Sequence, residues 1–298
     1  YKLFSDTLIH YRNYITKLLN DGVHRASTHH DYICFARIME EWNDNQRVSI
    51  RYVYQFDRAF CVRFLDYVYI ERENSPRTRN NYLAFLRSFS AFLVQHLYIK
   101  EKPTDGLVSI GKALLKKERK VIAVDDMQRL HDWLQENNRY FLLVCYFLHY
   151  MLIRPKEIAK LRLCDISVSK QTVYIDDTIS KNKRSACVIE LMAELGYFDA
   201  PSTYYIFSKD FRPGPEWVNE KTYRDFWSRK IRPALHFPKE YKFYSLKDTG
   251  ITAMLRAGYD TLSVKEQARH SSLLMTDVYT PQDIRDANPL LLNYQGVL

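Results

Sequence analysis

The groups best suited to chemistry in this sequence are a set of cations, one histidine and one tyrosine in its second half. Arg154 follows the apolar run 141–152, and a basic segment at 180–184 joins two runs of strand-forming residues. Further along come Lys247, His270 and Tyr279. Arginine and lysine side chains bind phosphate oxygens, and a tyrosine hydroxyl can form a covalent ester. These residue types suit phosphoryl transfer, in which positioned cations offset the negative charge of the transition state.

No pattern of metal ligands accompanies these groups. The cysteines are odd in number, widely scattered and never two residues apart; they are Cys34, Cys61, Cys145, Cys164 and Cys187. Such spacing predicts neither a zinc site nor a disulfide framework.

Composition and charge narrow the class of protein. A chain of 298 residues is long enough for two domains, and only 8 Gly and 10 Pro favour helices. Lys and Arg number 44 against 35 Asp and Glu, a formal net charge of +9. This balance favours a polyanionic partner such as nucleic acid, although charge alone does not establish one.

The first hundred residues show helical periodicity throughout. Apolar residues recur at helical spacing over 2–20, and further helices are expected from Thr28 to about 42, over about 54–72, and from Ser75 and Pro76 onward. We expect a helical domain over 1–102. Pro103 and Gly106 then break the pattern, and 103–120 is predicted to be a basic linker to a second domain over 121–298.

The second domain is expected to be helical around a small β-hairpin. Helices are predicted around 127–134 and 141–152, followed by strands at 172–175 and 186–191 with the basic segment at the hairpin tip. More helices are expected at about 217–234, 246–257, 262–270 and 273–280, before an apolar tail at 289–298. The predicted fold class is therefore mainly α with a small β-hairpin, an α+β fold.

Several motifs, in this order, resemble the tyrosine recombinase (phage integrase) family. They are Ser75-Pro-Arg-Thr-Arg-Asn-Asn-Tyr82, Arg154-Pro-Lys-Glu157-Ile-Ala-Lys-Leu161, the basic hairpin, Ser245-Leu-Lys-Asp-Thr-Gly250, Ala268-Arg-His270-Ser-Ser and Thr276-Asp-Val-Tyr279-Thr. The resemblance covers nearly the whole chain. It implies a helical core-binding domain joined to a catalytic domain, and site-specific DNA strand cleavage and rejoining through a 3′-phosphotyrosine.

The resemblance also implies roles for single residues. Arg154 would hold the scissile phosphate, His270 would donate a hydrogen bond to it, and Tyr279 would attack it. Lys181 would protonate the leaving 5′ oxygen, with Lys183 as the competitor for this role. A covalent tyrosine ester keeps the energy of the broken diester, so we expect no metal and no cofactor.

The second catalytic motif departs from the family, which usually has His, two residues, then Arg. Here those positions are Tyr244 and Lys247. A lysine keeps the charge but loses the planar fork of arginine. A tyrosine can donate a hydrogen bond, but it cannot act as a base near neutral pH. Lys247 is expected to bind phosphate, and for Tyr244 packing is the alternative.

Double-stranded DNA is the expected partner. The residues predicted to contact it are Arg77, Arg79, Asn80, Asn81 and Arg87 on the fourth helix and Lys116 and Lys117 in the linker. A solvated helix surface is the alternative for both groups. The resemblance implies a monomer that forms a homotetramer on synapsed DNA, with the C-terminal tail docked on a neighbour and with accessory DNA-bending proteins as possible further partners.

Three functions stay open from the sequence. The first is a recombinase or integrase of a mobile element or a DNA inversion system. The others are a type IB topoisomerase and a recombinase-derived DNA-binding regulator with a weakened active site. No apolar run approaches the length of a membrane span and no secretory signal is evident, so a cytoplasmic, nucleoid-associated protein is expected.

Overall fold

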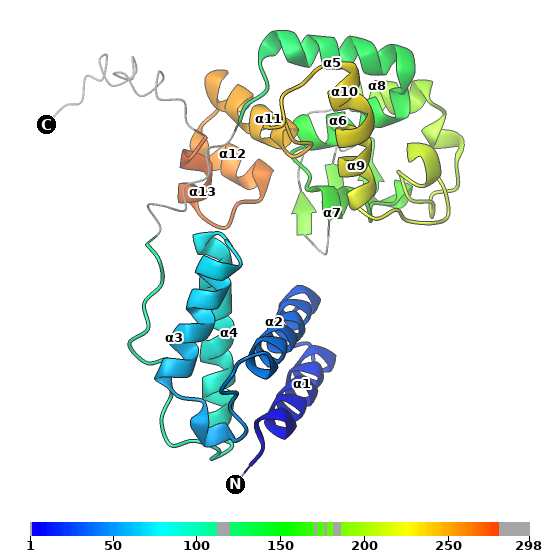
Figure 1. Ribbon diagram of the computed structural model, residues 1–298. Coiled ribbons are helices and arrows are strands. Elements are labelled where there is room, and N and C mark those ends of the chain that lie inside the picture. The colour runs from blue at the N-terminus through cyan, green and yellow to red at the C-terminus, as the bar shows by residue number, and fades with distance from the viewer. Residues whose placement is uncertain (1, 112–119, 170–171, 176–177, 181–185, 280–298) are drawn as a thin grey trace, which may run out of the picture. The chain divides into compact units, whose positions relative to one another are not determined.

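The computed structural model describes residues 2–111, 120–169, 172–175, 178–180 and 186–279. They form two compact units, 1–117 and 118–298, which Figure 1 shows as ribbons. Both units are mainly helical and the second has a small sheet, so the predicted fold class is confirmed. Among the described residues, no helix is both long and apolar enough to cross a membrane.

Within the described residues, four α-helices build the first unit. They are α1 (Phe4–Asn20), α2 (Ala26–Asp44), α3 (Arg58–Asp66) and α4 (Pro76–Gln95). The predicted helices are confirmed with two corrections. Helix α2 begins earlier than predicted, with Arg25 and not Thr28 at its N-cap. The third predicted helix is divided into the 3-10 turn η1 (Val53–Gln55), α3, and the π-helical turn η2 (Tyr67–Glu71).

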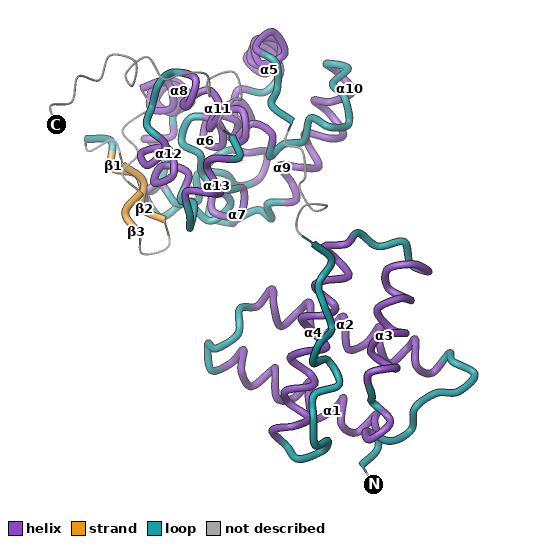
Figure 2. Tube along the Cα trace, turned by 90° about the vertical axis from the view of Figure 1, so that its left-hand side faces the viewer, coloured by secondary structure: helices purple, strands orange, loops and turns teal. Residues whose placement is uncertain are grey.

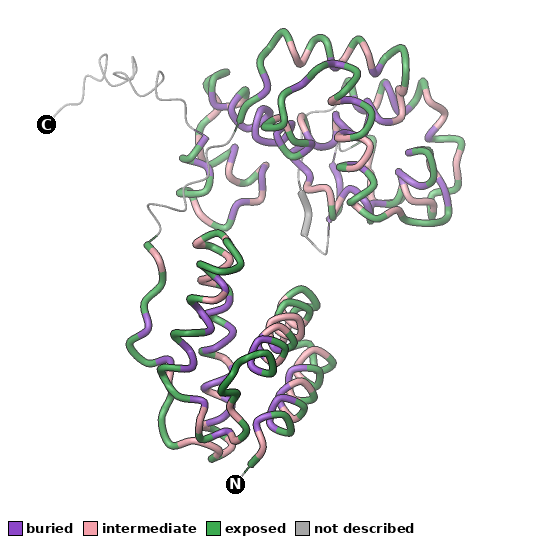
Figure 3. The backbone as a smooth tube through the Cα atoms, in the orientation of Figure 1, coloured by how far each residue is buried: buried purple, intermediate pink, exposed green. Residues whose placement is uncertain are grey.

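Aromatic side chains fill the core of the first unit. Each helix buries one face, as Figure 3 shows. The ring of Tyr11 packs edge-on against Phe89 and Phe92, with centroids 5.0 and 5.1 Å apart. Helix α4 begins as predicted, because the Ser75 hydroxyl accepts a hydrogen bond from the Thr78 amide at 3.2 Å.

The first half of the predicted linker belongs to the first unit. Thr104 and Leu107 are buried, and the Arg87 guanidinium donates to the Leu107 carbonyl at 2.6 Å. Asn80 and Ile110 exchange two hydrogen bonds of 3.0 Å between the side-chain amide and the backbone. The packed chain of this unit therefore continues to residue 110.

The second unit is built around α6 (Arg139–His149), whose side chains from Phe141 to Leu148 are buried except for Tyr146. The other helices are α5 (Val124–Asn137), α7 (Pro155–Ile158), α8 (Ala186–Glu194), α9 (Lys221–Phe226), α10 (Arg232–Ala234), α11 (Ser245–Arg256), α12 (Thr261–Ala268) and α13 (Leu273–Asp277). The shorter turns are η4 (Leu163–Asp165), η5 (Tyr197–Asp199), η6 (Lys209–Phe211) and η7 (Trp227–Ile231).

The sheet differs from the predicted hairpin. Strands β1 (Ile166–Ser167), β2 (Thr172–Ile175) and β3 (Thr178–Ser180) pair antiparallel in that order, and Figure 2 shows them in orange. Pairing of Ile175 with Thr178 places the basic segment after β3 and not between paired strands. The predicted strand at 186–191 is wrong, because this segment belongs to α8. Its buried residues, Val188, Leu191 and Met192, recur at helical spacing.

Helices α6 and α11 pack with almost no space between their backbones. A Cβ atom on Gly250 would lie 2.1 Å from the carbonyl oxygen of His149, so only glycine fits at this crossing. Beside it, His149 Nδ1 donates to the Leu246 carbonyl at 3.1 Å. Burial lowers the pKa of His149, and its hydrogen bond to the Leu246 carbonyl opposes this shift. The crossing fixes the first turn of α11 next to the turn that leads to Arg154.

Candidate active site

Arg154 stands at the N-cap of α7, directly before Pro155. Its backbone amide donates to Oε2 of Glu157 at 2.7 Å, and Nη1 donates to Oε1 of the same carboxylate at 3.2 Å. Nη2 donates to the backbone carbonyl of Arg269 at 2.8 Å. The side chain is 34% exposed, so the guanidinium is held in place while part of it faces solvent.

Glu157 also binds a second guanidinium, that of Arg269. Arg269 terminates α12 and has left-handed backbone angles, φ 51° and ψ 51°. The side chains of Glu157 and Arg269 are each 17% exposed. One carboxylate therefore holds two arginines that are far apart in the sequence.

Lys247 lies close to Arg154 and Arg269 and is completely buried. Its Nζ donates to the carbonyl of Leu152 at 2.6 Å and to that of Ala268 at 3.1 Å. Burial, and then the nearby charges of Arg154 and Arg269, lower the pKa of Lys247 to about 7. The ammonium joins the turn before Arg154 to the turn before His270.

Tyr279 is buried beside His270. The two rings stack with centroids 5.9 Å apart and an angle of 16° between their planes. The Tyr279 hydroxyl donates to Oδ1 of Asp248, on α11, at 2.8 Å. His270 Nδ1 is 2.9 Å from the hydroxyl oxygen of Thr276. Helix α13 lies between His270 and Tyr279 in the sequence, and its short turn brings the two rings together.

The structure thus brings Arg154, Lys247, His270 and Tyr279 into one cluster. Tyr244 directly precedes α11, and its side chain is 37% exposed. Lys181, its competitor Lys183, and the linker residues Lys116 and Lys117 lie outside the described residues. The C-terminal tail also lies outside them.

On α4 the predicted DNA-contacting residues divide into two groups. Arg77 and Asn81 are exposed on the first turns. Arg79 donates to the carbonyl of Val108 at 2.8 Å, and Asn80 and Arg87 bind the same segment, 107–110. These three residues hold the chain that leaves the first unit, and contact with DNA remains a prediction for all five.

The sequence alone did not indicate Asp248, Arg269 or Thr276 as parts of the cluster. Glu157 had a recognisable signal, because an acidic residue three positions after a helix N-cap commonly returns to bind the N-cap amide. Arg269 had none, since its partner Glu157 is 112 residues away. Among the described residues, no group of three His, Cys, Asp or Glu side chains could hold a metal ion.

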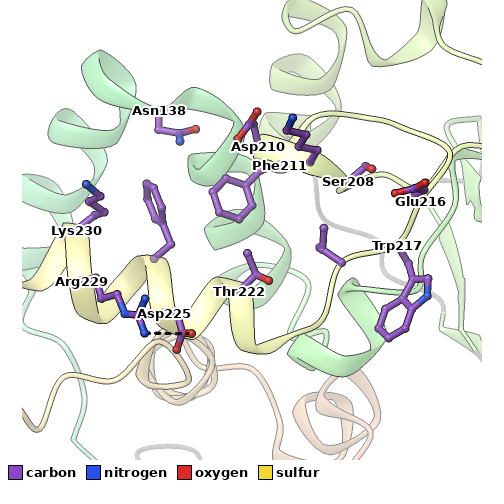
Figure 4. A pocket seen from close by; sticks show the side chains of 13 residues that line it. Asn138, Ser208, Asp210, Phe211, Glu216, Trp217, Thr222, Asp225, Arg229 and Lys230 are labelled. Carbon is purple, nitrogen blue, oxygen red and sulfur yellow. Dashed lines mark ion pairs between the residues drawn. The ribbon is translucent and has the colours of Figure 1, made fainter.

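A pocket of about 650 Å³ lies elsewhere in the second unit (Figure 4). Its lining combines Trp217 and Phe226 with Asp225, Arg229 and Lys230. None of the clustered residues named above lines it. It is therefore separate from the candidate active site.

Comparisons with known proteins show which family the chain resembles. The model of the phage integrase family matches residues 120–285. Tyrosine recombinase XerC of Caldanaerobacter subterraneus subsp. tengcongensis is 26% identical over 267 residues, which cover 83% of this chain and 72% of that protein.

Solved structures show the same fold at low identity. The Tn1549 transposon integrase in complex with circular intermediate DNA has a TM-score of 0.71 at 14% identity, covering 94% of this chain and 96% of its own. A lambda integrase tetramer bound to a Holliday junction has a TM-score of 0.72 at 12% identity, covering 96% and 79%. Because the family model alone spans more than half of the sequence, the chain belongs to the phage integrase family, the tyrosine recombinases, which cleave and exchange DNA strands.

Proposed function

We propose that the protein is a site-specific DNA recombinase that cuts and rejoins strands through a 3′-phosphotyrosine at Tyr279. The observation that carries the proposal is the position of the Tyr279 ring against His270, in the same cluster as Arg154. A nucleophile, a hydrogen-bond donor and a held cation from three segments of the chain meet there. Such a combination is what transfer of a phosphodiester to a side chain requires.

The proposed cleavage step exchanges one ester for another. Tyr279 Oη attacks the scissile phosphorus, an O–P bond forms, and the bond between phosphorus and the 5′ oxygen breaks. Asp248 already accepts a hydrogen bond from this hydroxyl, so its carboxylate is placed to take the phenolic proton. The leaving 5′ oxygen takes a proton from Lys181. Attack by a 5′ hydroxyl of a partner duplex reverses the step and restores the tyrosine.

Charge stabilisation falls to the groups around Glu157. Negative charge on the non-bridging oxygens grows in the transition state, and a fixed guanidinium offsets it without reorganisation. Arg154 meets this need, because hydrogen bonds from its guanidinium to Glu157 and to the Arg269 carbonyl fix its position. His270 donates to the same phosphate, and the contact with Thr276 orients its ring.

The assembly and biological role are proposed from the relatives. Lambda integrase forms a tetramer on a Holliday junction, and the transposon integrase binds a circular DNA intermediate. We therefore expect free monomers that form a homotetramer on two synapsed duplexes, in a mobile element or an inversion system. Accessory DNA-bending proteins and association with the nucleoid belong to the same proposal.

The test is covalent capture on DNA. Genomic fragments retained by a Tyr279→Phe variant, which binds but cannot attack, would identify the site. Wild-type protein is then incubated with a nicked suicide duplex of that site, and we expect an adduct that survives denaturation and maps to Tyr279. Tyr279→Phe should give none.

Binding of that duplex without any adduct would instead support a DNA-binding regulator. Relaxation of supercoiled plasmids that lack the site would support a type IB topoisomerase.

A further inference from the structure

Arg269 has no place in the reaction as proposed above, yet it lies at the centre of the cluster. Its guanidinium shares Glu157 with Arg154, and its backbone carbonyl accepts a hydrogen bond from Arg154 at 2.8 Å. The next residue is His270. Two planar guanidinium groups are thus held by one carboxylate, beside the ring that stacks on the nucleophile.

The backbone of Arg269 is held in a conformation that favours glycine. Its φ of 51° puts it in the left-handed region, at the C-terminal end of α12. Helices commonly end with glycine in this conformation, and a residue with a Cβ is strained there. Strained residues of this kind cluster at functional sites. The side chain of Arg269 is therefore a candidate for a function that offsets the strain.

Lys247 cannot supply a second guanidinium. Its side chain is completely buried, and its ammonium donates to the carbonyls of Leu152 and Ala268. A lysine also lacks the flat fork that binds two oxygens of one phosphate. In this structure Lys247 is a positioning residue that holds two turns together, and Arg269 follows directly on one of them.

Positive charge is in excess at this point, because two guanidinium groups share the single carboxylate of Glu157. Lys247 and Asp248 lie nearby. The two arginines contribute, after burial, to the low pKa of Lys247. A phosphodiester anion bound between the guanidinium groups would neutralise this excess.

We propose that Arg269 is a catalytic residue that binds a non-bridging oxygen of the scissile phosphate, supplying the second guanidinium of the site. This role rests on the proposed recombinase function. The rival explanation is that Arg269 only pairs with Glu157 and thereby orients Arg154. The double variant Arg154→Ala/Arg269→Ala, compared with Arg154→Ala, separates the two, because Arg269 can orient Arg154 only where Arg154 is present.

The experiment measures single-turnover adduct formation by the full chain on suicide duplexes of the recovered site. One duplex has an ordinary scissile phosphate, and the other has a methylphosphonate, in which a methyl group replaces a charged oxygen. Arg269→Ala and Arg269→Lys are compared with wild type. Arg229→Ala is the matched control, because it removes an arginine that also pairs with a carboxylate, Asp225, but lies outside the active-site cluster. The Arg229 side chain is 79% exposed. Thermal unfolding and DNA binding of each variant show that it is folded.

We expect Arg269→Ala to slow adduct formation on the phosphate on the order of 100-fold, the usual effect of removing one donor to a transition-state oxyanion. On the methylphosphonate the same variant should come within about tenfold of wild type, because no charge remains to be offset. Arg269→Lys should recover part of the rate on the phosphate, and Arg229→Ala should match wild type.

Two results overturn the inference while leaving the recombinase in place. One is the same rate on the phosphate for Arg154→Ala and for Arg154→Ala/Arg269→Ala, which would mean that Arg269 acts only through the position of Arg154. The other is no deficit at all. Failure of wild type to form any adduct with the bound phosphate duplex would overturn the recombinase proposal itself, and the role of Arg269 with it.

Discussion

At the scale of single residues, the resemblance to the family indicated candidate side chains but not how they are held. Arg154, His270 and Tyr279 were named from that resemblance, and the structure places them together, while their roles stay predictions. The partner of Tyr279, Asp248, is 31 residues away, a contact for which one sequence has no signal. For Lys247 the sequence indicated a charge. Only the fold shows that this charge is buried and bonded to two carbonyls.

The lowered pKa of Lys247 predicts how the free energy of unfolding depends on pH. In the unfolded chain its pKa lies near 10.4, so between about pH 7 and 10 the unfolded state binds a proton that the folded state has released. Because the folded pKa is about 7, raising the pH through this window favours the folded protein. The free energy of unfolding of wild type should rise by up to about 1.4 kcal/mol per pH unit relative to Lys247→Met.

Urea denaturation of both proteins at several pH values between 7.5 and 9.5 measures this difference. Every other titrating group is common to the two chains and cancels. Parallel pH profiles would show that Lys247 keeps its ordinary pKa in the folded protein.

At the scale of elements, periodicity predicted the long helices correctly, but it did not identify the secondary structure of a short apolar run. The long amphipathic segments became α1, α4 and α5, and the apolar run at 141–152 lies largely in α6. The run at 186–191 is too short to distinguish a buried strand from a helix, and the structure makes it part of α8. Contacts between elements were beyond prediction, as Gly250 shows. In the sequence it is a weak helix former inside a helix, and only the crossing with α6 explains it.

Gly250→Ala is expected to destabilise the protein, although alanine favours a helix by about 1 kcal/mol. The added Cβ would lie 2.1 Å from the His149 carbonyl and 2.9 Å from a Leu152 methyl, so α6 and α11 must move apart. We expect a loss of about 2–3 kcal/mol in the free energy of unfolding, the range of overpacked cores.

Chemical denaturation of Gly250→Ala beside Gly111→Ala measures the effect. A Cβ on Gly111 meets nothing within 4 Å, so this control should stay within about 0.5 kcal/mol of wild type. Equal stability of the two variants would show that the helices can separate at little cost.

At the scale of the whole molecule, the change in composition after residue 102 predicted a domain boundary there, and that boundary stays a prediction. Pro103 and Gly106 indicated a break, and the chain does turn there. Arg79, Asn80 and Arg87 nevertheless bind the following residues to α4 through backbone groups. Such bonds leave no trace in hydrophobic periodicity, so the sequence predicted either contact with DNA or a solvated helix surface for these three residues.

A fragment of residues 1–111 should therefore be more stable than one of residues 1–102. The shorter fragment lacks Leu107, which is only 8% exposed, and it lacks the hydrogen bonds from α4 to residues 107–110. We expect a difference of about 2–4 kcal/mol, from one buried leucine and several hydrogen bonds. Urea denaturation followed by circular dichroism measures it, and coincident curves would place the end of the unit at 102.

The bond between Tyr279 and Asp248 has a consequence for how several copies would work together. Among the described residues, the nucleophile and the cations Arg154 and Lys247 belong to one chain. In the proposed assembly, each subunit would therefore cut its strand with its own tyrosine. Contacts between subunits would then set the order of cleavage among the four strands, by determining when each tyrosine leaves its aspartate.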